Sequence, residues 1–122
     1  MLALRDANRI VLAALLAAAD MKWNVAVAVV DDNGHLISLQ RMDGTPQGSE
    51  RFAEEKARAA MHYKRPTKAL EDDAVQGRSV AVILLEGGLP LIRDGVYIGA
   101  IGISGAKSSE DGLIAERGAA AL

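Results

Sequence analysis

Apolar residues recur along the first twenty positions at spacings of three and four, which is the period of one helix face. The residues of this stripe are Leu4, Ala7, Val11, Leu15 and Ala18. After Asp20 the period changes to two, with valines at positions 25, 27 and 29 alternating with Asn24, Ala26 and Ala28. The pattern predicts a helix and then a strand with one large and one small apolar face. Both faces are therefore expected to be covered.

Two dipeptides that favour tight turns divide the remaining strand-like runs into hairpins. Asn33-Gly34 and Asp94-Gly95 suit turns whose central residues have positive φ. The predicted strand pairs are Asn24–Asp32 with His35–Met42, and Leu89–Arg93 with Val96–Ser104. A continuous apolar run, Val80–Leu85, predicts one further strand.

Helix signals fill the segments between and after these strands. Ser49 resembles an N-cap of a helix that runs to about Lys64, where Pro66 stops it. A short helix is expected over Thr67–Gln76 with Gly77 as its stop, and a last helix over Ser108–Ala121. Together the elements predict one α+β domain over residues 1–122, with a mostly antiparallel sheet of about five strands and flanking helices, of the profilin-like kind.

Gly99, Gly102 and Gly105 are spaced three apart but do not form a nucleotide-binding loop. The first two lie inside a predicted strand, where no helix start can present amides to a phosphate. Strand alternation instead places Ala100 and Gly102 on one small-residue face. We expect the helix that carries Ala53, Ala57 and Ala60 to lie close against this face.

Composition limits the classes of function. The formal net charge is −2 and the pI is about 5.6, which argues against a nucleic-acid binder. The absence of cysteine excludes disulfides and thiolate chemistry. The charged N-terminal helix does not resemble a signal peptide, and no run is apolar and long enough to span a membrane, so the expected location is the cytoplasm. Aromatics make up only 3%, and a core of small side chains favours a homo-oligomer.

The chemically capable residues fall into two groups. His35, after the first turn, and His62, on the polar side of its helix, are candidate haem ligands, although solvated histidines would show the same pattern. Neither has the spacing of a zinc site.

Cations and acids form the second group. Lys56 and Arg41 are candidate contacts for a carboxylate, with surface ion pairs as the alternative. Glu110 and Asp111 are candidate catalytic groups, while acids in a first helical turn also serve as caps. The bend Gly87–Pro90, in which Gly87, Gly88 and Pro90 are candidate ligand contacts, is expected to border one pocket with Lys56 and the start of the last helix.

Three stretches carry a resemblance to a known family: "VAVVDDNGHLISLQRMDG", "SERFAEEKARAA" and "GGLPLIRDGVYIGAIGISGAKSSEDGLIAERG". They resemble the GlcG/HbpS family, which is often labelled haem-degrading and includes the C-terminal domain of PduO-type adenosyltransferases. The resemblance covers nearly the whole chain. It implies a profilin-like domain that forms dimers or larger oligomers, and haem or a corrinoid as ligand of some members.

Three functions follow as hypotheses. The first is a small-molecule-binding protein, with haem or a related tetrapyrrole as ligand. The second is a cofactor-free enzyme that acts on a small organic acid through Lys56, Arg41 and one of the acids Glu110 and Asp111. The third is a structural or accessory subunit.

Overall fold

The computed structural model describes residues 1–75 and 85–122. Its helices are α1 (Leu4–Asp20), α2 (Ser49–Tyr63), α3 (Thr67–Val75) and α4 (Ser108–Ala119). Its strands are β1 (Ala26–Asp31), β2 (Leu36–Arg41), β3 (Gly88–Arg93) and β4 (Val96–Ser104). The strands pair antiparallel in the order β2-β1-β4-β3, so each predicted hairpin forms and the two hairpins join through β1 and β4.

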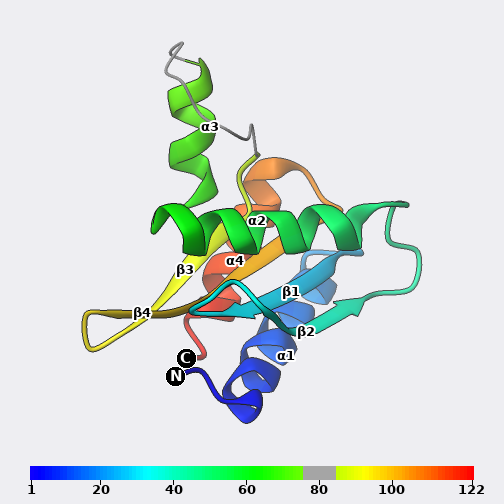
Figure 1. Ribbon diagram of the computed structural model, residues 1–122. Coiled ribbons are helices and arrows are strands. Elements are labelled where there is room, and N and C mark those ends of the chain that lie inside the picture. Colours follow the sequence, from blue (N-terminus) through cyan, green and yellow to red (C-terminus); the bar gives the residue numbers. More distant parts are fainter. Residues whose placement is uncertain (76–84) are drawn as a thin grey trace.

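The sheet is covered on both faces by helices of the same chain (Figure 1). Helix α2 crosses one face, α1 and α4 lie on the other, and α3 stands away from the body. Val27 and Val29 of β1 face the α1 and α4 side, where they pack with Ile101 and Ile103, whereas Val30 packs on the α2 side. The predicted α+β fold and the two apolar faces of β1 are therefore confirmed. Because helices of the same chain cover both faces of the sheet, the apolar faces of β1 do not by themselves indicate a partner subunit.

The small-residue face allows α2 to lie directly on the sheet. Ala26, Ala28 and Ala100 are fully buried against the alanines of α2. Gly102 pairs with Ala28 of β1, and a Cβ at this position would overlap the carbonyl oxygen of Ala53. Gly102 therefore serves close packing of helix on sheet, as its place in the strand predicts.

Several details differ from expectation. The structure describes four strands rather than about five. The predicted strand Val80–Leu85 and the stop at Gly77 lie outside the described residues, except that Leu85 is described and lies in no strand. Ser49 is not an N-cap but the first helical residue of α2, preceded by Gly48, whereas α4 begins at Ser108 as predicted. The last helix ends at Ala119, before the predicted Ala121. No helix in residues 1–75 and 85–122 is long and apolar enough to cross a membrane.

Candidate functional site

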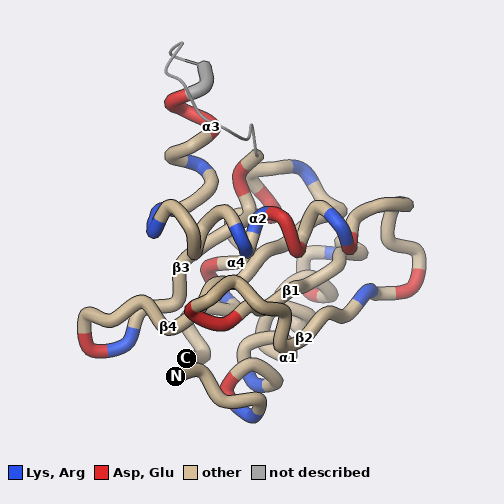
Figure 2. Tube along the Cα trace, viewed as in Figure 1, with Lys and Arg blue, Asp and Glu red and all other residues tan. Residues whose placement is uncertain are grey.

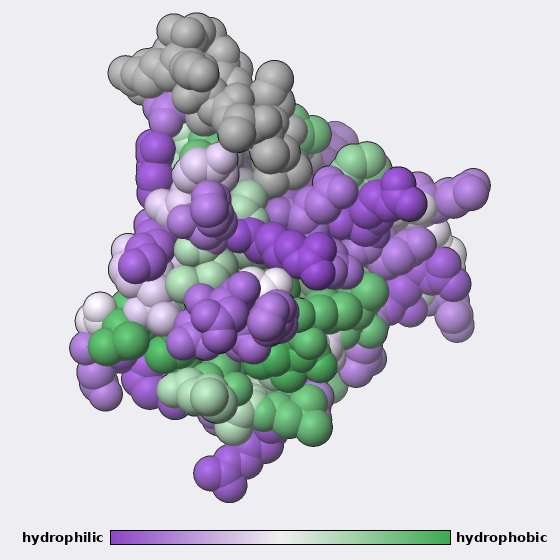
Figure 3. Space-filling model, in the orientation of Figure 1, coloured by the Kyte–Doolittle hydropathy of each residue, from purple (hydrophilic) through white to green (hydrophobic). Residues whose placement is uncertain are grey.

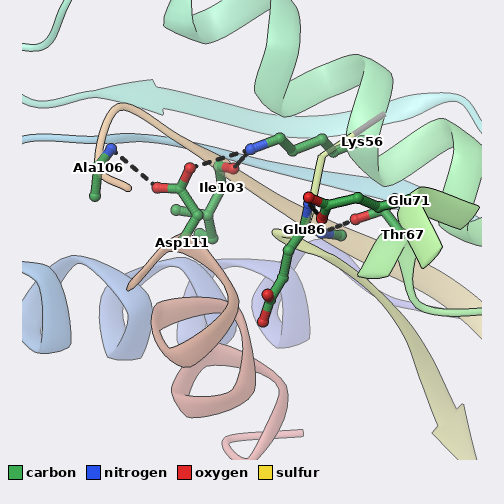
Figure 4. Close-up of polar contacts among 8 residues, drawn as sticks. Lys56, Thr67, Glu71, Glu86, Ile103, Ala106 and Asp111 are labelled. Carbon is green, nitrogen blue, oxygen red and sulfur yellow. Dashed lines mark hydrogen bonds and ion pairs between the residues drawn. The ribbon is translucent and has the colours of Figure 1, made fainter. Parts of the chain in front are cut away.

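A buried ion pair joins α2 to the start of α4 (Figure 4). The ammonium of Lys56 lies 3.1 Å from Oδ2 of Asp111 and donates a hydrogen bond of 2.8 Å to the carbonyl oxygen of Ile103. The two side chains are only 6% and 3% exposed. The other carboxylate oxygen of Asp111 accepts the amide N–H of Ala106 at 3.0 Å. Asp111 thus accepts a hydrogen bond from the segment that precedes α4. It is a buried partner of Lys56 as well as an acid in the first turn of the helix.

The bend before β3 closes over this pair. The amide of Gly88 donates to Oγ1 of Thr67 at 2.8 Å, and the carbonyl of Gly87 accepts the amide of Ile103 at 2.9 Å. Gly87 has φ +136°, and a Cβ there would lie 2.9 Å from Nζ of Lys56. The predicted neighbours Lys56, Gly87 and Asp111 therefore do lie together. They lie in tight contact, with both charges already paired, rather than around an open pocket.

The remaining residues of the predicted pocket lie elsewhere or play no visible part. Arg41 ends β2 and is exposed, 3.9 Å from Glu50. Glu110 is half-buried in the first turn of α4, and Pro90 is half-buried inside β3. Among the described residues, no hydrogen bond or ion pair joins any of the three to Lys56. Their roles, like the catalytic role of Lys56 and Asp111, stay predictions.

Burial raises the pKa of the Asp111 carboxyl above its ordinary value of 3.8, although the Lys56 ammonium acts in the opposite direction. The folded protein therefore keeps this proton to a higher pH than the unfolded chain does. The stabilisation that this proton contributes is fully present below pH 3.8. It is lost as the pH rises through the pKa that Asp111 has in the folded protein.

We accordingly expect the free energy of unfolding of the unmodified protein to fall, relative to that of Asp111→Asn, as the pH rises from below 3.8. Urea unfolding of both proteins at matched pH values measures this difference. If the unmodified protein instead became more stable relative to Asp111→Asn as the pH rises, burial would not raise the pKa of Asp111 as proposed.

A second arrangement brings the two histidines to one groove. The groove has a volume of about 930 Å³ and lies between the β1–β2 turn, residues 32–35, and the C-terminal half of α2. His35 lines it from the turn with a side chain that is 80% exposed. His62 lines it from α2, with its ring edge-on to Tyr63 at 4.8 Å between centroids. The sequence pattern identifies each histidine separately and contains no signal that they share a surface.

Two cations also line this groove, and they are held differently. The guanidinium of Arg58 donates to the carbonyl of Gly34 at 3.2 Å and forms an ion pair with Glu54, so it fastens the turn to α2. Lys64, just after α2, holds its ammonium 5.7 Å from the ring centroid of Tyr97. Figure 2 shows basic and acidic residues interspersed along α2. The groove therefore combines imidazoles and cations with nearby acids.

The histidines do not belong to a metal-ion site of the usual kind. Across residues 1–75 and 85–122, no group of three or more His, Asp or Glu side chains is arranged to hold a metal ion. In the view of Figure 3, the surface over α2 and the β1–β2 turn is mainly hydrophilic. A ligand held here by histidine would have to bring its own metal and the remaining metal ligands.

Known proteins resemble the chain in sequence. Protein GlcG of Escherichia coli strain K12 is 42% identical over 87 residues, which are 67% of this chain and 65% of GlcG. The matched region is thus slightly less than two thirds of that relative.

The likeness to solved structures covers nearly the whole chain. The crystal structure of a PduOC–haem complex has a TM-score of 0.93 and 31% identity, covering 99% of this chain and 94% of that one. A double mutant of Streptomyces reticuli HbpS has a TM-score of 0.89 and 33% identity, covering 99% and 86%. The model of the family described as haem degrading protein HbpS-like matches residues 2–120, and the chain therefore belongs to the HbpS-like family.

Proposed function

We propose that this protein binds haem, or a closely related tetrapyrrole, in the groove between the β1–β2 turn and α2. The observation that carries the proposal is that His35 and His62, far apart in the sequence, line one groove. Histidine is a common axial ligand of haem iron. The similarity to the PduOC–haem complex supports the same ligand class.

The size and lining of the groove agree with such a ligand. Its volume of about 930 Å³ lies within the range of sites for small molecules and cofactors. Met61 and Tyr63 offer apolar contact, and Lys64 offers a cation for a propionate. Arg58 is already engaged with Gly34 and Glu54, so its main effect is to hold the turn in place.

We propose that His62 would hold the haem iron and that His35 would support the bound group. His62 projects from a helix, and groups on rigid elements are positioned better than groups in turns. When bound, haem would supply the iron chemistry. The protein's own contribution would be one imidazole ligand and a cation for the propionates.

Haem titration followed by absorbance tests the proposal. The purified protein is expected to give a Soret band that His62→Ala loses or shifts and that His35→Ala keeps with weaker affinity. The double variant His35→Ala/His62→Ala has no histidine left and should lose the histidine-ligated spectrum, which added imidazole should restore.

An exposed residue away from the groove supplies the control. Leu113→Ala on α4 removes a side chain that is 49% exposed and should leave the titration unchanged. A double histidine variant that binds haem with the same spectrum and affinity as the unmodified protein would contradict the proposed site.

The alternative, a cofactor-free reaction on a small organic acid, has one observation in its favour. A buried carboxyl with a raised pKa, such as that of Asp111, is typical of acid–base sites. However, Lys56 and Asp111 are satisfied by each other and by backbone groups. A structural role explains this pair without a substrate, so the groove is the stronger candidate for function.

A further inference from the structure

Lys64, which follows α2 and lines the groove, has a backbone conformation that lysine rarely adopts. Its φ is +54° and its ψ is +42°, the left-handed region in which a Cβ crowds the backbone. Helices that end in this conformation commonly carry glycine there. A lysine at such a position costs free energy of folding, so its side chain is expected to serve something other than stability.

The ammonium of Lys64 lies over an aromatic ring instead of beside a carboxylate. Its Nζ is 5.7 Å from the ring centroid of Tyr97, a half-buried residue of β4. The next cation along the chain, Arg65, is paired with Asp73 at 2.9 Å. In the described part of the chain, no ion pair joins Lys64 to an acid. Because the contact of an exposed lysine with a ring is weak, the charge of Lys64 is available to a ligand.

The groove also has an acidic end. Glu55 lines it from α2, and roughly 12 Å of helix axis separate this residue from Tyr63 in the last turn. Arg58, between them, is already engaged in an ion pair and in a hydrogen bond to the β1–β2 turn. The groove is therefore expected to attract the carboxylates of a ligand at Lys64 and to repel them at Glu55.

We propose that the groove selects tetrapyrroles whose carboxylates lie on one edge of the ring, and that Lys64 is the residue that selects them. This selectivity rests on the proposed function, and it names the part of the ligand that the protein recognises besides the iron. Haem belongs to the class, because its two propionates are neighbours on one edge and the opposite edge carries methyl and vinyl groups. A tetrapyrrole with carboxylates on opposite edges would bring some of them to Glu55 and bind more weakly.

Haem and haem dimethyl ester separate recognition of the carboxylates from binding of the iron. The two compounds share the iron and the ring and differ only in their free acid groups. In absorbance titrations of the unmodified protein, the dissociation constant of haem is expected to be roughly tenfold below that of the ester. Lys64→Gly should raise the dissociation constant of haem by about the same factor and leave that of the ester nearly unchanged. The melting temperature should stay the same or rise, because glycine adopts the left-handed conformation without strain.

Lys22→Gly is the matched control. Lys22 also follows a helix, is exposed and has a φ of +62°, but it does not line the groove. Its helix, α1, lies on the opposite face of the sheet from α2 (Figure 1). This variant removes a lysine of the same backbone conformation and should leave both dissociation constants unchanged.

Glu55→Gln tests the acidic end of the groove. The substitution should strengthen binding of iron coproporphyrin, which carries four propionates, severalfold and change the binding of haem less. Glu116→Gln, at an exposed position of α4, should change neither. A Glu55→Gln variant that strengthens the binding of both compounds equally, or of neither, would overturn the role of this end.

The outcomes separate the selectivity from the proposed function. If neither haem nor its ester gives a Soret band that depends on the histidines, the proposed function fails and the selectivity of Lys64 with it. If both compounds give that band with equal affinity, the proposed function stands and the selectivity is overturned. An equal loss of affinity for haem in Lys64→Gly and Lys22→Gly would also overturn it, because the effect would then not come from the groove.

Discussion

Asp111→Ala is expected to lower the free energy of unfolding by about 3–5 kcal/mol at pH 7, because it leaves the Lys56 ammonium buried without the oxygen acceptor that Asp111 supplies. The variant also removes the acceptor for the Ala106 amide. Lys56→Met/Asp111→Asn should recover most of the loss, since Met fills the space of the lysine stem and Asn can still accept the amide. Urea unfolding monitored by circular dichroism measures all three proteins.

A surface pair of similar geometry serves as the control. Lys68 and Asp72 lie 3.0 Å apart on α3 with side chains about half exposed. Asp72→Ala should leave the melting temperature nearly unchanged, because water screens this pair. If Asp111→Ala were as harmless as Asp72→Ala, the buried pair would not be the connection between α2 and α4 that the structure indicates.

Gly102→Val is expected to destabilise the protein by about 3 kcal/mol or more, because its side chain would meet the backbone of α2 rather than a movable side chain. The Cβ would overlap the carbonyl oxygen of Ala53 and lie 2.7 Å from the amide nitrogen of Ala57. Helix α2 would have to lift from the sheet to make room. Thermal unfolding of the variant and the unmodified protein measures the cost.

Two further variants make this result specific. Gly95→Asn lies in the β3–β4 turn, where a Cβ meets nothing within 4 Å and Asn tolerates the positive φ, so stability should change little. Adding Ala53→Gly to Gly102→Val should give no relief, because the obstacle is a carbonyl group and not a methyl group. Relief by Ala53→Gly would show that helix and sheet meet through side chains instead.

Much of the fold could be predicted because the spacing of apolar residues indicates which face of each helix or strand is buried. The period-two pattern of β1 identifies a strand covered on both faces, and the turn residues identify both hairpins. Strand alternation predicts the correct face for Gly102 once the strand is recognised. The predicted start of α2 is off by one residue, since serine is common both at an N-cap and just after it, whereas α4 begins at Ser108 as predicted.

The site could be predicted only in part, because its contacts join segments far apart in the chain. Asp111 has the local signature of a first-turn acid, which does not distinguish a capping group from a buried partner of Lys56. The groove forms because the β1–β2 turn returns beside the end of α2, a tertiary contact that brings His35 and His62 to one surface. No local pattern in the sequence carries that information.

The haem groove is tested most directly by nuclear magnetic resonance of isotopically labelled protein to which ferric haem is added. Paramagnetic iron broadens the signals of nearby amides. We expect the amide signals of Gly34, His62 and Tyr63, around the groove, to broaden first, while those of Gly112 and Ile114 in α4 stay sharp. Broadening that centres on α4 or on α1 and leaves the signals of the β1–β2 turn unchanged would contradict the proposed site.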